Sequence, residues 1–236
     1  MMRWLAVLGF VCLVVWCAVT DIDVRLSASF YVPQHGWYLA HAFPWGWLYN
    51  YGEYPAIVLA GGAFLIVLRS VWRPTWARYR YPCLLVVLAV SLGPGLLVNG
   101  ILKPLWGRPR PRHVEQFGGT ELYRMWWQPG GPGVGESFPA GHAAMGFILL
   151  AGACLVPHRC VWERRLVYAA ALGYGSLMGW ARIVQGGHFL SDGIWAGGLM
   201  CLLVAVLQAT LLRPTRTCMV VDDSTDATVA RQNENT

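Results

Sequence analysis

Six long apolar stretches alternate with polar segments along the chain. They are Trp4–Thr20, Pro55–Trp72, Pro82–Leu102, His142–Pro157, Leu166–Ala181 and Gly193–Leu212. A helix needs about 20 residues to cross a hydrocarbon core of about 30 Å, and the fourth and fifth stretches are the shortest. None of the stretches shows two-residue alternation, which favours helices over the strands of a β-barrel. The pattern predicts an all-α, polytopic membrane protein with six transmembrane helices.

Composition supports this class. Of the 236 residues, 56% are hydrophobic and only 13% are charged, whereas a soluble domain has about a quarter charged residues. The length suits one membrane domain over residues 1–220, and the polar segment 221–236 predicts a disordered cytoplasmic tail. A signal peptide is an alternative for the first stretch, but the segment Asp21 to Arg25 that follows lacks a small-residue cleavage pattern. We therefore expect an uncleaved first helix.

The distribution of basic residues predicts the orientation. With the N-terminus inside, eleven Lys and Arg residues are cytoplasmic and seven lie on the opposite side. The polar motifs described below then face away from the cytoplasm. No cysteine falls in an outward loop, where oxidation would pair it.

Two outward segments are rich in aromatic residues. Residues 21–53 predict a belt along the outer membrane interface, and membrane anchoring is favoured there over a substrate platform. Residues 103–141 form the longest outward loop, and their tryptophans and tyrosines argue against disorder.

The first polar motif begins where the third apolar stretch ends. Lys103 and Arg110 are seven positions apart, and Pro104, Pro109 and Pro111 stiffen the chain around them. Two fixed cations of this kind can bind the oxygens of a phosphate, the arginine in bidentate fashion. The alternative is a basic helix end that reaches the lipid headgroups.

The second motif, Pro139-Ala140-Gly141-His142, immediately precedes an apolar helix. The first backbone N–H groups of a helix have no internal partners and carry the positive end of the dipole. Gly141 allows an oxyanion to approach the backbone closely, and His142 can donate a proton to a leaving alkoxide. The alternative is a histidine that only caps the helix.

The third motif combines Arg182, His188 and Asp192. His188 and Asp192 are four positions apart and share one face of a helix. The carboxylate can then accept a hydrogen bond from one ring nitrogen, which leaves the other nitrogen as a nucleophile. Arg182 adds a third cation. The alternative is an interfacial His–Asp pair that stabilises a helix start.

Together the motifs predict a two-step phosphoryl transfer. His188 attacks phosphorus to form a phosphohistidine, while His142 protonates the departing oxygen and then serves as a base for water. Lys103, Arg110 and Arg182 stabilise the charge of the transferring group. The outward segments lack a carboxylate cluster with metal-ligand spacing, so we expect a metal-independent reaction without a cofactor. An anion transporter is the alternative outside enzymes, but central charges and internal repeats are missing from the stretches.

The three motifs, in this order, resemble those of the type 2 phosphatidic acid phosphatase (PAP2) superfamily. The matching residues are Lys103, Arg110 and Pro111, then Pro139 to His142, then Arg182, His188 and Asp192. The resemblance implies the six-helix fold, the phosphohistidine route and the residue roles given above. Ala140 and Ala181 stand where the family pattern has serine, so two hydroxyls that could bind phosphate are missing.

Three short strings further resemble bacterial lipid A phosphatases. They are Trp106-Gly107-Arg108, Phe117-Gly118-Gly119 and Glu136-Ser137-Phe138. This implies a lipid A 1- or 4'-phosphatase in the bacterial inner membrane, with its active site facing the periplasm and with Trp106 and Arg108 as possible substrate contacts. Undecaprenyl pyrophosphate, phosphatidylglycerol phosphate and phosphatidic acid are alternative substrates, and a lipid phosphotransferase is an alternative activity. The expected partners are the substrate and the bilayer, without nucleic acid.

Overall fold

The computed structural model describes residues 2–212, so the tail predicted over residues 221–236 lies outside the described part of the chain. Over the described residues the fold is helical, and its β pairing is limited to two isolated bridges, Val32 with Gly36 and Val114 with Glu121. This confirms the all-α prediction.

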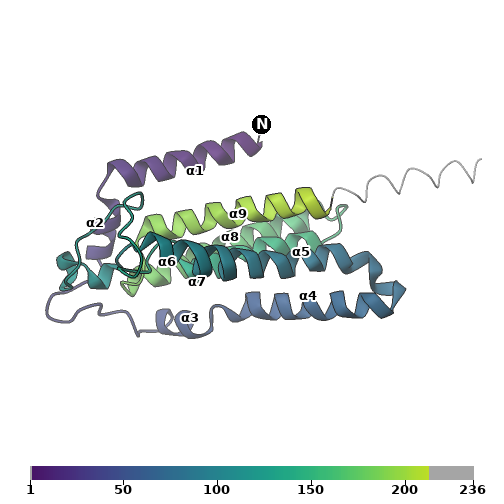
Figure 1. The fold of residues 1–236 in the computed structure, drawn as a ribbon, viewed down its shortest axis with the longest axis horizontal. Helices are drawn as coiled ribbons and strands as arrows, with labels where there is room; N and C mark the ends of the chain where they lie inside the picture. Colours follow the sequence, from purple (N-terminus) through teal and green to yellow (C-terminus); the bar gives the residue numbers. More distant parts are fainter. Residues whose placement is uncertain (1, 213–236) are drawn as a thin grey trace, which may run out of the picture.

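Long helices occur at each of the six predicted positions and run along the long axis of the molecule (Figure 1). They are α1 (Met2–Val19), α4 (Tyr54–Trp72), α5 (Arg80–Val90) continued by η2 (Ser91–Leu102), α7 (Gly141–Phe147) continued by η5 (Ile148–Leu155), α8 (Val161–Val184) and α9 (Leu190–Leu211). The shorter elements are α2 (Ile22–Ala28), α3 (Trp45–Tyr51), η1 (Pro74–Tyr79), α6 (Lys103–Trp106), η3 (Pro111–His113) and η4 (Glu115–Phe117).

Three helical segments of the described chain are long and apolar enough to cross a membrane. They are Trp45–Trp72, Pro74–His113 and Leu190–Leu211, and a fourth is added if Val7–Val19 and Ile22–Ala28, which bend by 75° at their junction, form one span. Gly141–Leu155 is apolar but shorter, and the first two turns of α8 contain the charged residues Glu163, Arg164 and Arg165. The helices are those of a membrane protein.

Small residues allow the helices to approach closely. A Cβ at Gly146 would lie 2.7 Å from the Cα of Gly175, so α7 and α8 pack backbone against backbone. Close contacts of this kind are typical of helix packing in membranes. Helix α1 lies along α9 (Figure 1), where the Phe10 ring meets the Trp195 ring edge-on at 5.4 Å and occupies the space left by Gly198.

The third long helix widens before the first motif. Residues Ser91–Leu102 form a π-helix that contains Pro94, which has no N–H to donate to the helix ladder. The side-chain amide of Asn99 donates to the Pro94 carbonyl at 2.8 Å. Such widened turns are frequent at functional sites, and this one ends directly before Lys103.

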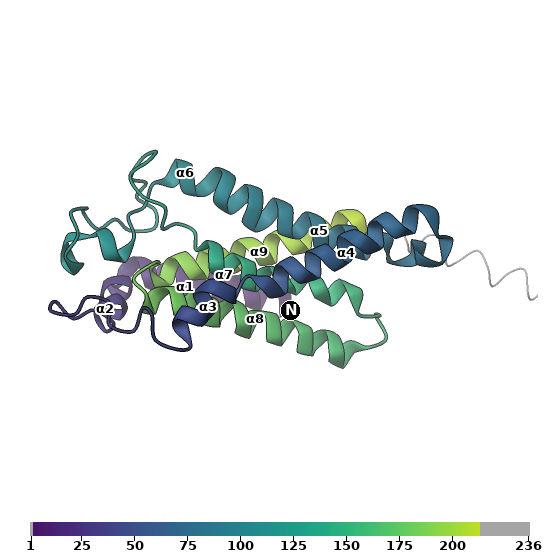
Figure 2. The same ribbon diagram turned by 90° about the horizontal axis from the view of Figure 1, so that it is seen from below.

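The three motifs meet at one end of the bundle. Helix α6, the start of α7, the end of α8 and the start of α9 all lie there, whereas the α4–α5 and η5–α8 connections lie at the opposite end (Figures 1 and 2). The long loop over this end is ordered, because Val114 and Phe117 are buried together with Phe189, against Tyr31 and Trp37.

Candidate active site

His188 lies in the turn between α8 and α9 and is buried. Its Nδ1 is 2.6 Å from the backbone carbonyl oxygen of Ser137. A carbonyl can only accept, so Nδ1 carries the proton and Nε2 keeps a free electron pair. Burial lowers the pKa of His188 to about 4, which keeps the imidazole neutral at pH 7. The ring therefore has the tautomer and charge that a nucleophile needs.

The partner of this ring differs from the one expected. We expected Asp192 to accept the hydrogen bond from His188, but its Oδ2 lies 3.7 Å from Nδ1, too far for a hydrogen bond. The same Oδ2 accepts instead from the Ser137 hydroxyl at 2.6 Å and from the Phe189 amide at 2.9 Å. The carboxylate thus ties together both segments that hold His188, and its charge also acts on the ring.

Arg108 also has a different environment from the expected one. We expected it to contact substrate, but its guanidinium is fully buried and pairs with Asp192 and, at 2.9 Å, with Asp23. It also donates to the Ser191 hydroxyl at 2.8 Å and to the Arg124 carbonyl at 2.9 Å. With its donors turned to these partners, Arg108 connects α2 to the start of α9 rather than facing a lipid.

His142 is in the first turn of α7 and meets two residues from the α3–α4 segment. Its ring stacks on that of Tyr49, with centroids 5.1 Å apart and planes 9° from parallel. Its Nδ1 lies 3.5 Å from Oε1 of Glu53. The ring is also within electrostatic range of His188 and Arg182. The two predicted histidines thus lie in one site.

The three predicted phosphate-binding cations lie in the same region. Lys103 is close enough to Arg110 and Arg182 for their charges to act on one another. The Nζ of Lys103 lies against the first turn of α7, because a Cβ at Gly141 would be only 2.9 Å from it. Arg110 pairs with the exposed Glu136 at 3.1 Å. The cations, the N–H groups in the first turn of α7 and the two histidines together form a region suited to an anion.

Arg182 is buried and only partly paired. Its Nη1 donates to Oε1 of Gln185 at 2.6 Å, and its guanidinium lies 4.5 Å above the Tyr49 ring. Its Nε has no hydrogen-bond partner among the described residues. A buried donor without a partner is costly, and the oxygen of a bound phosphate would satisfy it.

The remaining predicted positions are structural in this arrangement. The indole N–H of Trp106 donates to the Trp126 carbonyl at 2.7 Å, and its ring lies 4.9 Å from that of Phe138. Ala140 and Ala181, which replace serines of the family pattern, are both buried. The Ala140 amide donates to the Asp192 carbonyl at 3.2 Å and so ties the start of α7 to α9.

Sequence reasoning missed several residues around the site. Tyr49 and Glu53 both belong to the aromatic segment 21–53, whose composition predicts a membrane anchor. Ser137 belongs to the string Glu136-Ser137-Phe138, whose resemblance to other phosphatases predicts no role for the serine itself. Asp23, an acidic residue beside an apolar helix, carried a signal in itself, because carboxylates at membrane depth usually have a specific partner.

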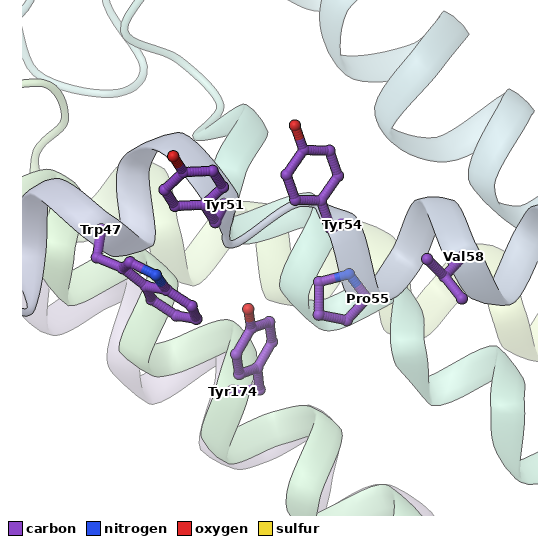
Figure 3. A pocket seen from close by; sticks show the side chains of 6 residues that line it. All are labelled: Trp47, Tyr51, Tyr54, Pro55, Val58 and Tyr174. Atoms are coloured by element: carbon purple, nitrogen blue, oxygen red, sulfur yellow. The ribbon is translucent and has the colours of Figure 1, made fainter.

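Two further features of the described residues bear on chemistry. Residues 2–212 contain no group of three or more His, Cys, Asp or Glu side chains that could hold a metal ion, and metal independence stays a prediction. An open apolar hollow is lined by residues of α3, α4 and α8 (Figure 3). Its lining residues are Trp47, Tyr51, Tyr54, Pro55, Val58 and Tyr174.

Known proteins place the chain in a family. A model of the PAP2 superfamily matches residues 81–214, which include all three motifs and more than half of the chain. The lipid A 4'-phosphatase of Francisella tularensis subsp. novicida is 30% identical over 231 residues, which cover 90% of this chain and 98% of that protein. The lipid A 4'-phosphatase of Rhizobium leguminosarum is 36% identical over 160 residues, or 62% of this chain and 67% of that protein. No solved structure matches. The chain therefore belongs to the PAP2 superfamily and is a membrane phosphatase of that family.

Proposed function

We propose that this protein hydrolyses a phosphate monoester of lipid A, at the 4' position, through a phosphohistidine on His188. The convergence of two histidines and three cations at one end of the bundle carries the proposal. The choice of lipid and position rests on the similarity to proteins named lipid A 4'-phosphatase, one of which aligns over 98% of its length.

In the first step, the free electron pair on Nε2 of His188 attacks phosphorus. The bond between phosphorus and the lipid oxygen breaks, and His142 gives its proton to that oxygen. In the second step, a water oxygen attacks the phosphohistidine while His142 takes up a proton from the water. The N–P bond breaks, inorganic phosphate leaves, and both histidines return to their starting states.

The cations stabilise the group in transfer. Lys103, Arg110 and Arg182 bind its non-bridging oxygens, and the buried, unpaired Nε of Arg182 is a ready donor. Because these donors are fixed before the substrate arrives, the site needs little rearrangement when charge develops. The proposal requires neither a metal ion nor a cofactor.

We further propose six membrane spans with the site at the periplasmic face of the inner membrane. The helix connections alternate between the two ends of the bundle (Figures 1 and 2). The end opposite the site carries many arginines, as cytoplasmic loops do. They are Arg69, Arg73, Arg78, Arg80, Arg159, Arg164 and Arg165. The shorter α7–η5 helix then crosses the membrane with the motif loop completing its outer end.

The direct test is a panel of purified lipid phosphates assayed with the detergent-solubilised protein. It comprises lipid A with both phosphates, undecaprenyl pyrophosphate, phosphatidylglycerol phosphate and phosphatidic acid. We expect fastest phosphate release from lipid A, with mass spectrometry showing loss of the 4' phosphate. His158→Ala, at the opposite end of the bundle, is the matched control for His188→Ala. Faster turnover of another lipid, loss of the 1 phosphate, or transfer of the phosphoryl group to a second lipid would contradict the assignment.

A further inference from the structure

We infer that Glu53 and Tyr49 are positioning residues for His142, which hold its protonated ring with Nε2 turned toward the leaving oxygen. The inference rests on the proposed role of His142 as the general acid. Neither residue belongs to the three motifs, and both come from the α3–α4 segment, far from His142 in the sequence.

The contacts restrain the ring in two ways. Stacking on Tyr49, at 5.1 Å and 9°, fixes the plane of the His142 imidazole. The Glu53 carboxylate, 3.5 Å from Nδ1, fixes its rotation within that plane, because it attracts the Nδ1 proton. The other ring nitrogen, Nε2, is left to carry the proton that is transferred. The same arrangement occurs in other catalytic histidines, where a carboxylate binds one ring nitrogen and orients the imidazole, and the second ring nitrogen transfers the proton.

The charges around His142 explain why a carboxylate is needed there. Arg182 on α8, Lys103 on α6 and His188 before α9 all lie within electrostatic range of the ring. Two of these groups are cations, so each opposes a positive charge on His142. Among the described residues, Glu53 is the carboxylate at ion-pair distance from this ring. Burial, together with these charges, lowers the pKa of His142 to about 3. The ring therefore needs nearby negative charge, from Glu53 and from a bound phosphate, to take up the proton that it donates.

Tyr49 links the acid to the phosphate-binding cation. Arg182 lies 4.5 Å over the Tyr49 ring that also stacks on His142, and both contacts favour a fixed aromatic plane. The α3–α4 junction that carries Tyr49 and Glu53 is itself anchored to α8. The Tyr174 hydroxyl donates to the Gly52 carbonyl at 2.8 Å, and Gly52 lies so close to Met178 that a side chain there has no room.

The test compares two substrates with different leaving groups in Glu53→Gln. Lipid A leaves as an alkoxide that needs a proton, whereas p-nitrophenyl phosphate releases a phenolate that leaves without one. We expect turnover of lipid A to fall about 10- to 100-fold and turnover of p-nitrophenyl phosphate to change by less than about threefold. With lipid A, the alkaline limb of the pH profile should move to lower pH, because His142 loses its proton more readily without the carboxylate.

Four variants complete the design. Glu163→Gln is the same chemical change at the start of α8, the end of the bundle opposite the site, and should leave the turnover of both substrates unchanged. Glu53→Asp keeps the carboxylate and should recover most of the lipid A turnover and the original pH profile. Tyr49→Phe keeps the stacked ring and should stay close to the unmodified protein, whereas Tyr49→Leu should lose activity.

The inference is overturned if Glu53→Gln has no effect, or if it slows both substrates equally without moving the pH profile, since that result indicates a purely structural role. Equal impairment in Glu53→Asp and Glu53→Gln would also overturn it. Failure of the proposed function looks different, because His188→Ala and His142→Ala would then keep their turnover of lipid A whatever Glu53 does.

Discussion

The Arg108 guanidinium and the Asp192 carboxylate form a salt bridge in which neither side chain has exposed surface. Asp23 pairs with the same guanidinium, so one buried cation holds two carboxylates from opposite ends of the chain. Asp192 in turn binds Ser137 and the Phe189 amide, the two segments on either side of His188. The position of His188, the proposed nucleophile, thus depends on a network that begins in α2.

Replacing Arg108 should strongly destabilise the protein, because its guanidinium is fully buried and paired. Arg108→Met leaves two buried carboxylates without a counter-ion, and breaking a buried pair in this way costs about 3–5 kcal/mol of the free energy of unfolding. Thermal unfolding in detergent measures the loss. Arg25→Ala removes an exposed partner of Asp21 on the neighbouring helical turn and should cost less than about 1 kcal/mol. Equal stability of the two variants would show that the network does not hold the fold.

Gly141→Ala should impair catalysis while leaving the fold intact. The added Cβ would lie 2.9 Å from Nζ of Lys103 and 3.2 Å from Oδ1 of Asn99, so the lysine must move away from the start of α7. A displacement of about 1 Å at a catalytic site can cost about 10²-fold in rate. Steady-state turnover of lipid A measures the effect. Gly61→Ala is the control, because nothing lies within 4 Å of its added Cβ. An unimpaired Gly141→Ala would remove Lys103 from the phosphate site.

The buried His188 should make stability fall in acid. Its pKa is lowered to about 4 in the folded protein, while an unfolded histidine has a pKa of about 6.5. Between these values the unfolded state binds more protons, so stability declines as pH falls from about 6.5 to about 4. His188→Asn keeps a donor for the Ser137 carbonyl but does not titrate. Its melting temperature should therefore decline less over this pH range. Parallel pH dependence in both proteins would contradict a neutral, buried imidazole.

Vanadate should inhibit the enzyme competitively with lipid A, because its five-coordinate form resembles the phosphoryl group in transfer. Arg182→Ala should weaken inhibition and raise the KM for the lipid, since both ligands use the same cation. Chelators should leave activity unchanged. Insensitivity to high vanadate concentrations would count against the site, and loss of activity in EDTA would refute the predicted metal independence.

The positions of the helices were predictable because each corresponds to a long stretch of apolar residues. The six stretches found by hydropathy coincide with helices in the structure, with ends that differ by a few residues. The π-helix at Ser91–Leu102 was not predicted, since it depends on how the Asn99 amide meets the Pro94 carbonyl. Long apolar patterns specify that a helix forms but not how its turns are wound.

The motifs predicted which residues share the site, and the structure supplied their partners. Spacing of four suggested that Asp192 binds His188, but a carbonyl from residue 137 takes that place. Arg108 donates a hydrogen bond to Asp23, 85 positions away, and His142 lies at ion-pair distance from Glu53. Contacts between distant segments leave no periodic signal in one sequence. The residues that contact the motif side chains could therefore be identified only from the structure.

The most direct test of the central claim is to trap the covalent intermediate. Protein mixed with ³²P-labelled lipid A is quenched within milliseconds in alkaline detergent, which preserves phosphohistidine, and the labelled peptide is mapped. We expect the label on His188, stable in base and lost in acid, and absent from His188→Asn. Label on another residue, or turnover of lipid A by His188→Asn at the original rate, would contradict the account.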